Sequence, residues 1–393
     1  RILVGLILGA ILGIAVPQAT GIAILGDVFV SALKAIAPLL VFFLVISSLC
    51  NAGKSHGGVI KTVIILYMFS TVLAAVIAVF ASMAFPVKMT LANAATDTSA
   101  PQGIVEVLNN LLLNVVANPV SSLVNANYVG ILMWAVLLGL AFRAADKMTK
   151  KVLADVADGI SMVVTWIINL APFGIFGLVF NTVSTNGLDI FTTYGKLLLL
   201  LVGCMLFIYF VTNPLLVYWC IRQNPYPLIF HCLKRSALTA FFTRSSAANI
   251  PVNMKVCEEM GLDRDTYSVT IPLGATINMD GAAITITVMT MATAFTLGIH
   301  VDIPTAIILS LLAALSACGA SGVAGGSLLL IPMACSLFGI SDDISMQVVA
   351  VGFIIGVVQD SVETALNSSS DLLLSASAEF RQWRLEGKEI KFK

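Results

Sequence analysis

The amino-acid sequence predicts an all-α membrane protein, and three observations carry that prediction. Hydrophobic residues make up 59% of the 393 residues and charged residues only 11%, whereas a soluble domain carries about 25% charged residues. Long stretches without a charged residue recur along the chain, and small polar groups interrupt those of the carboxy-terminal third. Because no water-soluble fold of this length hides so much apolar surface, we expect lipid to surround most of the chain.

The apolar stretches are long enough to cross a bilayer, which takes about 20 residues of helix. Helix is the expected conformation, because an open strand leaves backbone groups without hydrogen bonds in lipid. Stretches without a charged residue lie at 2–26, 62–87, 107–142, 159–188, 197–221, 281–301 and 303–341, and 34–51 and 344–380 add two that carry polar groups.

Basic residues gather in alternate connections between these stretches. By the positive-inside rule we expect these connections and both chain ends in the cytoplasm, with Lys88 and Lys196 as exceptions on the other side. The net charge is zero, so nothing indicates a nucleic-acid partner. The basic groups are Lys54 and Lys61; Arg143, Lys147, Lys150 and Lys151; Arg222, Lys234 and Arg235; Lys255 and Arg264; and Arg381, Arg384, Lys388, Lys391 and Lys393.

The seven cysteines form no C-x-x-C pair and lie mostly in apolar stretches. We therefore expect buried hydrophobic residues rather than disulfides or a metal site. The chain begins at Arg1 rather than at a methionine. We expect residues upstream of it and make no prediction about a signal peptide.

Two segments do not fit a simple crossing. Residues 303–341 are too long for one span, and the small residues 317–327 at their centre are poor at holding a helix. Residues 227–254 are similarly interrupted at 243–251. A helix with a polar cluster follows each segment, and the two tips are predicted to approach from opposite sides. Such an inverted repeat of re-entrant hairpins is typical of secondary transporters, whose binding site lies where the repeats meet.

The last apolar stretch carries a narrow polar stripe. Asp360, Thr364, Asn367 and Asp371 fall within about 60° of one helix face at 3.6 residues per turn, and Glu363 lies at the edge of that face. Carboxylates within the membrane are costly and usually functional. The stripe therefore predicts a binding site.

The preceding helix is interrupted by polar residues at Asn278 and Asp280, on either side of Met279 and followed by Gly281. Neighbouring polar residues on opposite sides of a helix predict local unwinding. Exposed carbonyl groups beside a carboxylate are hard oxygen ligands, suited to a cation such as Na⁺.

Arg244 at the first hairpin tip needs a carboxylate partner within the membrane, and both Asp360 and Glu363 are candidates. Backbone N–H groups at the half-helix starts, near Ser245, Ser246 and Gly325, are expected to hold a substrate carboxylate. A further polar patch, which alone favours hydrogen bonding between helices, consists of Tyr67, Ser70 and Thr71.

The combined motifs resemble the dicarboxylate/amino acid:cation symporter family, which has the glutamate-transporter-like fold, and its bacterial members that carry serine and threonine in particular. The resemblance covers nearly the whole chain. The motifs are T-R-S-S-A-A-N-I-P at 243–251, N-M-D-G at 278–281, S-G-V-A-G-G-S at 321–327 and D-x-x-x-T-x-x-N-x-x-x-D at 360–371.

The resemblance implies eight transmembrane helices, two opposed re-entrant hairpins and a homotrimer in a bacterial inner membrane. It implies an elevator mechanism in which a transport domain slides past a static scaffold. The scaffold would comprise residues 1–51 and 104–181. The transport domain would comprise 61–86, 190–222, hairpin 226–254, 264–292, hairpin 303–339 and 343–380, followed by a cytoplasmic tail at 381–393.

The resemblance also implies the ligands, with Na⁺ as the coupling ion and no cofactor. One sodium site would use carbonyls of Gly274, Asn278 and Asn367 with the Asp371 carboxylate. A second would use Thr276, Met279 and the second hairpin, and a third would join Asp280 and Asn278 to Tyr67, Ser70 and Thr71. Asp360 and Thr364 would hold the substrate ammonium group, and Asn367 and the Ser246 amide its carboxylate. Arg244, Ser245, Val323 and Gly325 would line the site, with the second hairpin as its gate.

Two positions depart from family members that carry acidic substrates. Those members have Arg where this chain has Glu363, and Thr where it has Ala282. Like charges about 5 Å apart repel by several kcal/mol at an effective dielectric constant near 20. We therefore expect glutamate and aspartate to be rejected and small neutral amino acids, serine and threonine above all, to be accepted. Pairing of Glu363 with Arg244 stays open as an alternative.

Three rival functions remain at this point. The first is a symporter for acidic amino acids or dicarboxylates, which Glu363 argues against. The second is an intramembrane serine protease, because residues 319–322 read G-A-S-G. A serine nucleophile needs a base within reach, and we expect His56, His231 and His300 all to lie away from Ser321. The third is a passive channel, but nothing indicates a continuous polar pore.

Glu363→Arg is expected to weaken serine transport and to admit an acidic substrate, because the new cation would pair with a side-chain carboxylate. Competition of serine and aspartate for uptake measures the change. An unaltered preference for serine over aspartate in this variant would count against the role of Glu363.

Overall fold

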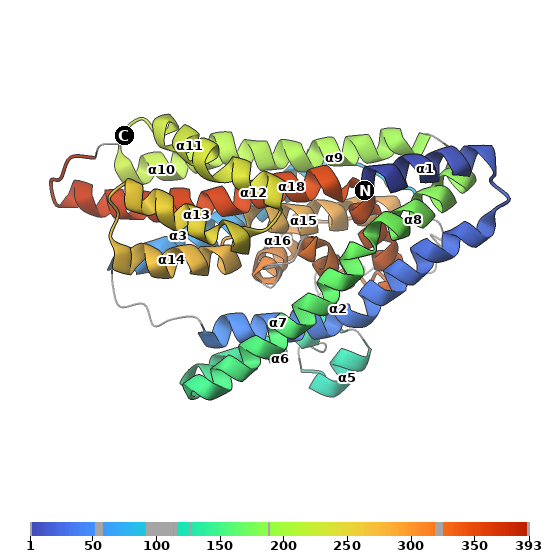
Figure 1. Ribbon diagram of the computed structural model, residues 1–393, viewed down its shortest axis with the longest axis horizontal. Helices are drawn as coiled ribbons and strands as arrows, with labels where there is room; N and C mark the ends of the chain where they lie inside the picture. The colour runs from blue at the N-terminus through green and yellow to red at the C-terminus, as the bar shows by residue number, and fades with distance from the viewer. Residues whose placement is uncertain are drawn as a thin grey trace.

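The computed structural model describes residues 2–51, 58–91, 113, 116–125, 127–187, 189–318 and 325–390. These residues form helices and no strand, which confirms the all-α prediction. Figure 1 shows long helices that run roughly alongside one another, with a second set crossing below them.

The amino-terminal half begins with two neighbouring helices and ends with the helix that carries Trp219. Its elements are α1 (Ile2–Ala15), η1 (Thr20–Ile22), α2 (Ala23–Asn51), α3 (Gly58–Ala84), α5 (Pro119–Val124), α6 (Tyr128–Ala141), η2 (Phe142–Ala144), α7 (Lys147–Asn169), α8 (Ala171–Asn186), α9 (Asp189–Phe207), η3 (Ile208–Thr212) and α10 (Asn213–Ile221).

The carboxy-terminal half contains shorter helices and one very long one. Its elements are α11 (Tyr226–Cys232), η4 (Leu233–Ala237), α12 (Leu238–Thr243), α13 (Ser246–Glu259), α14 (Arg264–Ile277), α15 (Asp280–Thr296), α16 (Ile303–Ala317), η5 (Gly326–Leu330), α17 (Ile331–Ser336) and α18 (Asp342–Leu385).

The helices pack in two groups. In the first, α2 lies against α6, α7 and α8, and α8 also lies against α1. In the second, α18 is the central element, with α3, α9 to α15 and α17 against it, and α16 lies against α3 and α15. Figure 1 shows α18, in red, running through this second group, while α2, α6 and α7 lie to one side. The polar stripe of α18 is therefore enclosed by protein rather than exposed to lipid.

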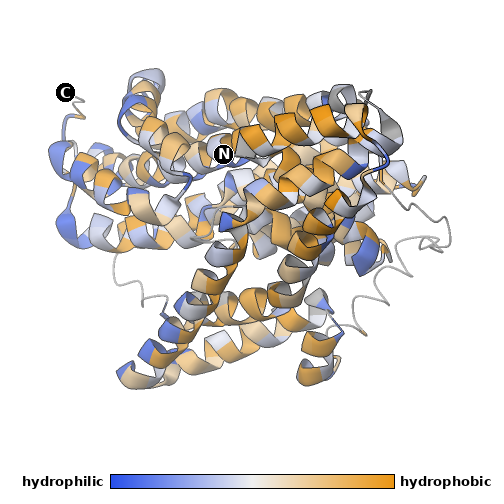
Figure 2. Cartoon of the chain, turned by 45° about the vertical axis from the view of Figure 1, so that its right-hand side comes forward, coloured by the Kyte–Doolittle hydropathy of each residue, from blue (hydrophilic) through white to orange (hydrophobic). Residues whose placement is uncertain are grey.

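Four helical segments are long and apolar enough to cross a membrane, judged by length and composition. They are Gly58–Ala84, Thr192–Ile221, Arg264–Thr296 and Asp342–Leu385, and α7 with α8, bent by 51°, adds a fifth if the pair is one span. Shorter apolar helices lie in the remaining predicted spans. Figure 2 shows hydrophobic residues along the bundle and hydrophilic residues at its end near the carboxy terminus. The number of eight spans stays a prediction.

The first interrupted segment forms a hairpin of two helical arms. Helix α12 ends at Thr243, and Ser245 caps α13 by accepting a 3.2 Å hydrogen bond from Ala248 N–H. The arms lie side by side, because Ser236 Oγ donates to Asn253 Oδ1 at 2.5 Å across them. Its second arm runs to Glu259 rather than to the predicted residue 254, and Arg235 of the first arm pairs with that glutamate.

The second interrupted segment has its arms in α16 and in η5 with α17. Ser316 Oγ of the first arm lies 3.5 Å from Met333 Sδ of the second, so the arms approach each other. Residues 319–324 at the tip lie outside the described part of the chain. Entry of either hairpin into a membrane stays a prediction.

The predicted unwinding around Met279, within the segment 264–292, is confirmed. Helix α14 ends at Ile277 and α15 begins at Asp280, so Asn278 and Met279 leave the helical conformation. Helix α15 continues to Thr296, four residues beyond the predicted end.

The last helix is longer than the predicted 343–380. Helix α18 runs from Asp342 to Leu385, because residues such as Arg381 and Gln382 favour helix as well as the apolar residues before them. Gly387 ends it with a φ of 74°, and Lys388 N–H reaches back to Trp383 O at 2.9 Å, the usual glycine stop.

Helix α1 packs closely on α8 through glycines spaced four residues apart, Gly5, Gly9 and Gly13. A Cβ atom on Gly9 would lie only 2.6 Å from Phe176 O of α8. Small residues at this spacing let helices in membranes approach each other's backbones. The close contact therefore depends on glycine, which has no side chain, at these positions.

Gly9→Ala is expected to lower the stability of the purified protein by about 1–3 kcal/mol, the usual cost of overpacking. Thermal unfolding in one detergent measures it. Gly195→Ala is the control, because nothing lies within 4 Å of its new methyl group. Equal unfolding temperatures for both variants would contradict the packing account.

Candidate functional site

Asp360 of α18 contacts both hairpins. Its Oδ2 is 3.7 Å from Arg244 Nε of the first hairpin, and its Oδ1 accepts a 3.1 Å hydrogen bond from Gly325 N–H of the second. Arg244 has a φ of 50°, a conformation that costs a non-glycine residue roughly 1–2 kcal/mol. The attraction to Asp360 offsets that cost. One carboxylate thus holds both tips.

Glu363, one turn further along α18, has different partners. Its Oε2 accepts hydrogen bonds from Thr285 Oγ1 at 2.7 Å and Ser327 Oγ at 2.9 Å, and another from Gln359. Arg244 pairs with Asp360 instead, so the alternative that Glu363 pairs with Arg244 is wrong. The physical reason is that two hydroxyl groups and an amide already surround Glu363 within the protein.

Asn367 anchors the start of α15 to the polar face. Its Oδ1 accepts a 2.7 Å hydrogen bond from Gly281 N–H, in the first turn of α15. Gly281 has no room for a side chain, because a Cβ atom there would lie 2.9 Å from Glu363 Cα. The predicted stripe and the predicted unwinding therefore meet in space.

Asp371 lies against the break between α14 and α15. Asn278 Nδ2 donates to its Oδ1 at 2.9 Å, and a Cβ atom on Gly274 would lie 2.8 Å from its Cγ. Tyr67 of α3 donates to the Asp371 backbone oxygen at 2.9 Å. Helices α3 and α14 thus meet α18 at Asp371, and the break after α14 bonds its buried carboxylate.

Asp280 at the start of α15 faces the polar patch of α3. Ser70 Oγ donates to Oδ2 at 2.7 Å, and Thr71 Oγ1 donates to Oδ1 at 3.2 Å. Met279 N–H donates to Thr71 Oγ1 at 3.2 Å. The Tyr67 hydroxyl, which the resemblance grouped with Asp280, donates instead to the backbone oxygen of Asp371.

The remaining residues of the predicted site lie in different parts of the structure. Thr364 is buried on the same face of α18, and Ala282 is fully buried in α15. Thr276 bonds back to Leu273 O at 2.7 Å. Ser246 begins α13 and is buried beside the capping Ser245. Val323 lies outside the described residues, as does the G-A-S-G string.

Several polar contacts escaped the sequence analysis. Gln359, Thr285 and Ser327 surround Glu363, and isolated hydroxyl groups within apolar stretches give no signal of their own. A second buried group ties the first hairpin to α18, since Asn249 Nδ2 donates to Ser368 Oγ at 2.8 Å and Asn253 Nδ2 to Ser368 O at 2.8 Å.

The arrangement around Asp371 and Asp280 suits a monovalent cation. Both carboxylates are fully buried, and a buried charge is costly unless it is paired. Asn278 Oδ1 is buried with no hydrogen-bond partner in the described part of the chain. Within the same part, no group of three or more His, Cys, Asp or Glu could hold a metal ion. Each site instead offers a single carboxylate together with carbonyl and hydroxyl oxygens, and these oxygens are hard ligands.

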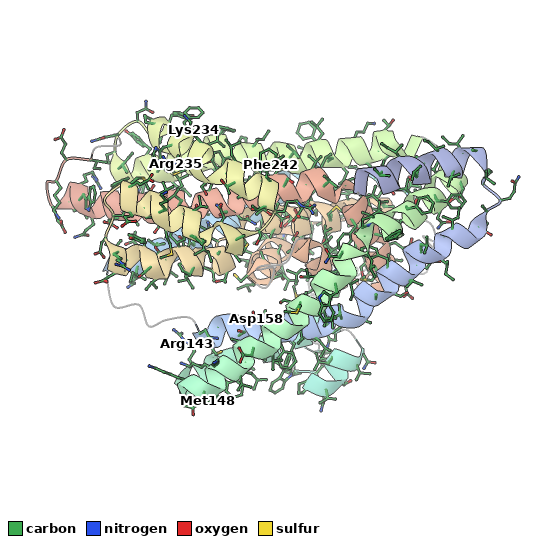
Figure 3. The ribbon with its side chains drawn as sticks, in the orientation of Figure 1. Arg143, Met148, Asp158, Lys234, Arg235 and Phe242 are labelled. Carbon is green, nitrogen blue, oxygen red and sulfur yellow. The ribbon has the colours of Figure 1, made fainter. Side chains whose placement is uncertain are left out.

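The outer surface of the first hairpin is different in character. Figure 3 shows Lys234, Arg235 and Phe242 at the surface of this hairpin. Phe242 is 79% exposed, as expected of a side chain that faces lipid. The functional groups therefore lie on the inner side of the hairpin, toward α18.

Residues 1–379 match the family model described as the sodium:dicarboxylate symporter family. The chain belongs to the sodium:dicarboxylate symporter family. The resemblance drawn from its motifs is thereby confirmed. As a symporter family member it is a multi-pass membrane transporter rather than an enzyme, which removes the protease alternative.

Curated relatives named serine/threonine transporter SstT match nearly the whole chain, and three of them illustrate the extent of the match. The protein of Bifidobacterium adolescentis is 59% identical over 391 residues, 99% of this chain and 91% of the relative. That of Streptococcus thermophilus is 56% identical over 385 residues, 98% and 96% of the two chains. That of Streptococcus agalactiae is 58% identical over 380 residues, 96% and 94%.

Asp371→Ala is expected to weaken sodium binding, because it removes the carboxylate from the predicted site that also comprises carbonyls of Gly274, Asn278 and Asn367. The sodium concentration for half-maximal thermal stabilisation should rise roughly tenfold or more, a loss of at least about 1.4 kcal/mol. Potassium provides the reference salt. Asp265→Ala, which removes an exposed carboxylate of α14, is the control. Wild-type sodium dependence in Asp371→Ala would contradict the assignment.

Proposed function

We propose that this protein takes up serine and threonine together with Na⁺. The observation that carries the proposal is the enclosed polar face of α18, where Asp360 contacts both hairpin tips and Asp371 lies at a helix break. Membership of the symporter family and the names of the relatives support sodium as the coupling ion and a hydroxyl amino acid as the substrate.

In this proposal the substrate ammonium group binds Asp360 and displaces Arg244 from it, with Thr364 beside it. Ser246 begins α13, whose first N–H groups are favourable for an anion and would receive the substrate carboxylate. Because Asn367 Oδ1 is bonded to Gly281 N–H, the Asn367 Nδ2 amide is the end that remains to donate to that carboxylate.

Three sodium positions are proposed on the same residues. The first uses Asp371 with carbonyls of Gly274, Asn278 and Asn367, and the close packing of Gly274 on Asp371 supports it. The third uses Asp280, Asn278, Ser70 and Thr71, with Tyr67 at its edge. The second uses Thr276, Met279 and the second hairpin; the 3.8 Å contact of Cys318 Sγ with Ile277 O supports the nearness of that hairpin.

The second hairpin is proposed as the gate. It is held to α18 by Gly325 N–H on Asp360 and by Ser327 on Glu363, so a ligand at Asp360 competes for the groups that hold the gate. Sodium and substrate that favour the same closed hairpin are coupled reciprocally. The membrane potential adds about 2.3 kcal/mol per elementary charge per 100 mV to the driving force.

At the level of the whole protein, we propose eight spans with two re-entrant hairpins, a homotrimer, and an elevator motion. The scaffold is residues 1–51 and 104–181, and the remaining helices form the transport domain. Helix α2 packs mainly on α6, α7 and α8 and touches α18 less extensively, which supports this division. We place the protein in a bacterial inner membrane with both ends cytoplasmic, on the basis of the basic connections.

Labelled serine is expected to accumulate in proteoliposomes with an inward sodium gradient and not with an equal potassium gradient. An excess of unlabelled threonine should compete, whereas aspartate and glutamate should not, because Glu363 repels a second carboxylate. Equal uptake with both cations would refute coupling to sodium. Competition by aspartate as strong as by threonine would instead support an acidic substrate.

A further inference from the structure

Glu363 is a fixed acceptor in the wall between α18, α15 and the second hairpin. Thr285 Oγ1 and Ser327 Oγ donate to it at 2.7 and 2.9 Å, and Gln359 donates as well. Gln359 Nε2 also donates to Thr285 Oγ1 at 2.8 Å, so the donors are linked to one another. The Gly281 backbone packs on the stem of Glu363, because a Cβ atom on Gly281 would lie 2.9 Å from Glu363 Cγ.

All three donors end on the same oxygen, Oε2. A carboxylate has two oxygens and about four acceptor positions. Within the part of the chain that the structure describes, no hydrogen bond ends on Oε1 of Glu363. Glu363 keeps 5% of its surface exposed, the same fraction as Asp360. The carboxylate is therefore held by one oxygen, and the other keeps its acceptor positions.

The position of Glu363 relative to Asp360 matches one small molecule. Residues three apart on a helix have Cβ atoms about 5–6 Å apart. Serine carries its ammonium group and its hydroxyl group on neighbouring carbon atoms. With hydrogen bonds of about 2.7–2.9 Å at each end, one serine can reach both carboxylates at once. Threonine adds only a methyl group on the same carbon.

We infer that Glu363 determines substrate specificity by accepting a hydrogen bond from the substrate hydroxyl, while Asp360 holds the ammonium group. This inference rests on the proposed function and adds to it. Repulsion of acidic substrates explains only what is excluded. An anionic acceptor at this place explains why a hydroxyl amino acid is preferred to an apolar one of equal size.

A purely structural role for Glu363 makes a different prediction. If Glu363 only bound the second hairpin through Ser327, its replacement would weaken the binding of all substrates alike. If it accepts the hydroxyl, its replacement changes the ratio between substrates. The ratio of inhibition constants is therefore the decisive quantity, and overall activity is not.

The first experiment uses the wild-type protein in proteoliposomes and inhibits labelled serine uptake with serine, alanine and 3-fluoroalanine. Fluorine is close to a hydroxyl group in size but donates no proton. Serine should inhibit at concentrations roughly tenfold or more below both analogues, as a charge-assisted hydrogen bond predicts. Threonine should likewise inhibit at lower concentrations than valine. Inhibition by 3-fluoroalanine equal to that by serine would overturn the inference.

The second experiment compares Glu363→Gln with Glu379→Gln, a control carboxylate on α18 that bonds Asp263 N–H at 2.7 Å far from the site. Glu363→Gln should reduce the ratio of the alanine inhibition constant to the serine inhibition constant severalfold, and Glu379→Gln should keep the wild-type ratio. If Glu363→Gln takes up serine and its ratio of inhibition constants is unchanged, the inference is overturned and the proposed function is not. Absence of sodium-driven serine uptake in the wild type would overturn the proposed function and this inference with it.

Discussion

The need to pair buried carboxylates is the constraint on which the rest of this structure depends. Helix α18 carries four of them, and each is bonded to a different part of the protein. Asp360 contacts both hairpin tips, Glu363 contacts α15, Asp371 contacts the break before α15, and Glu379 receives Asp263 N–H at the start of α14. Unpaired charge is so costly in such surroundings that each partner helix has a defined position along α18.

The same constraint links architecture to transport. The groups that satisfy Asp360 in this structure are the tip of one hairpin and the tip of the other. The cationic ligand that we propose at Asp360 would replace part of that pairing, so its binding would change what holds the hairpins. In the proposed mechanism, ligand binding and the position of the second hairpin would therefore depend on one set of contacts, which is the requirement for coupling.

The break between α14 and α15 has a similar double role. Continuous helix would satisfy its own backbone and leave no oxygen for an ion. At Asn278 and Met279 the backbone leaves the helix, and the Asn278 side chain turns toward Asp371 while Met279 N–H turns to Thr71. Irregular backbone at this depth is tolerated because protein surrounds it on every side that the structure describes.

Local pattern accounts for a large part of these features. Spacing along α18 placed Asp360, Asn367 and Asp371 on one face, and the polar pair around Met279 predicted the interruption of the helix. Both predictions hold because helical periodicity and helix breaking are properties of neighbouring residues. Helices α13, α15 and α18 extend beyond their predicted ends, since hydropathy marks the apolar part of a helix and not its cap.

The sequence by itself determined that the chain is helical, that it belongs in lipid, and which polar residues share a face. Only the tertiary structure decided which groups bind each other. Asp360 and Glu363 are one turn apart, and either satisfied the local rules as a partner for Arg244. The packing of α15 and the second hairpin brought Thr285 and Ser327 to Glu363 and left Asp360 for Arg244. Such choices depend on residues distant in the chain, and no local pattern contains them.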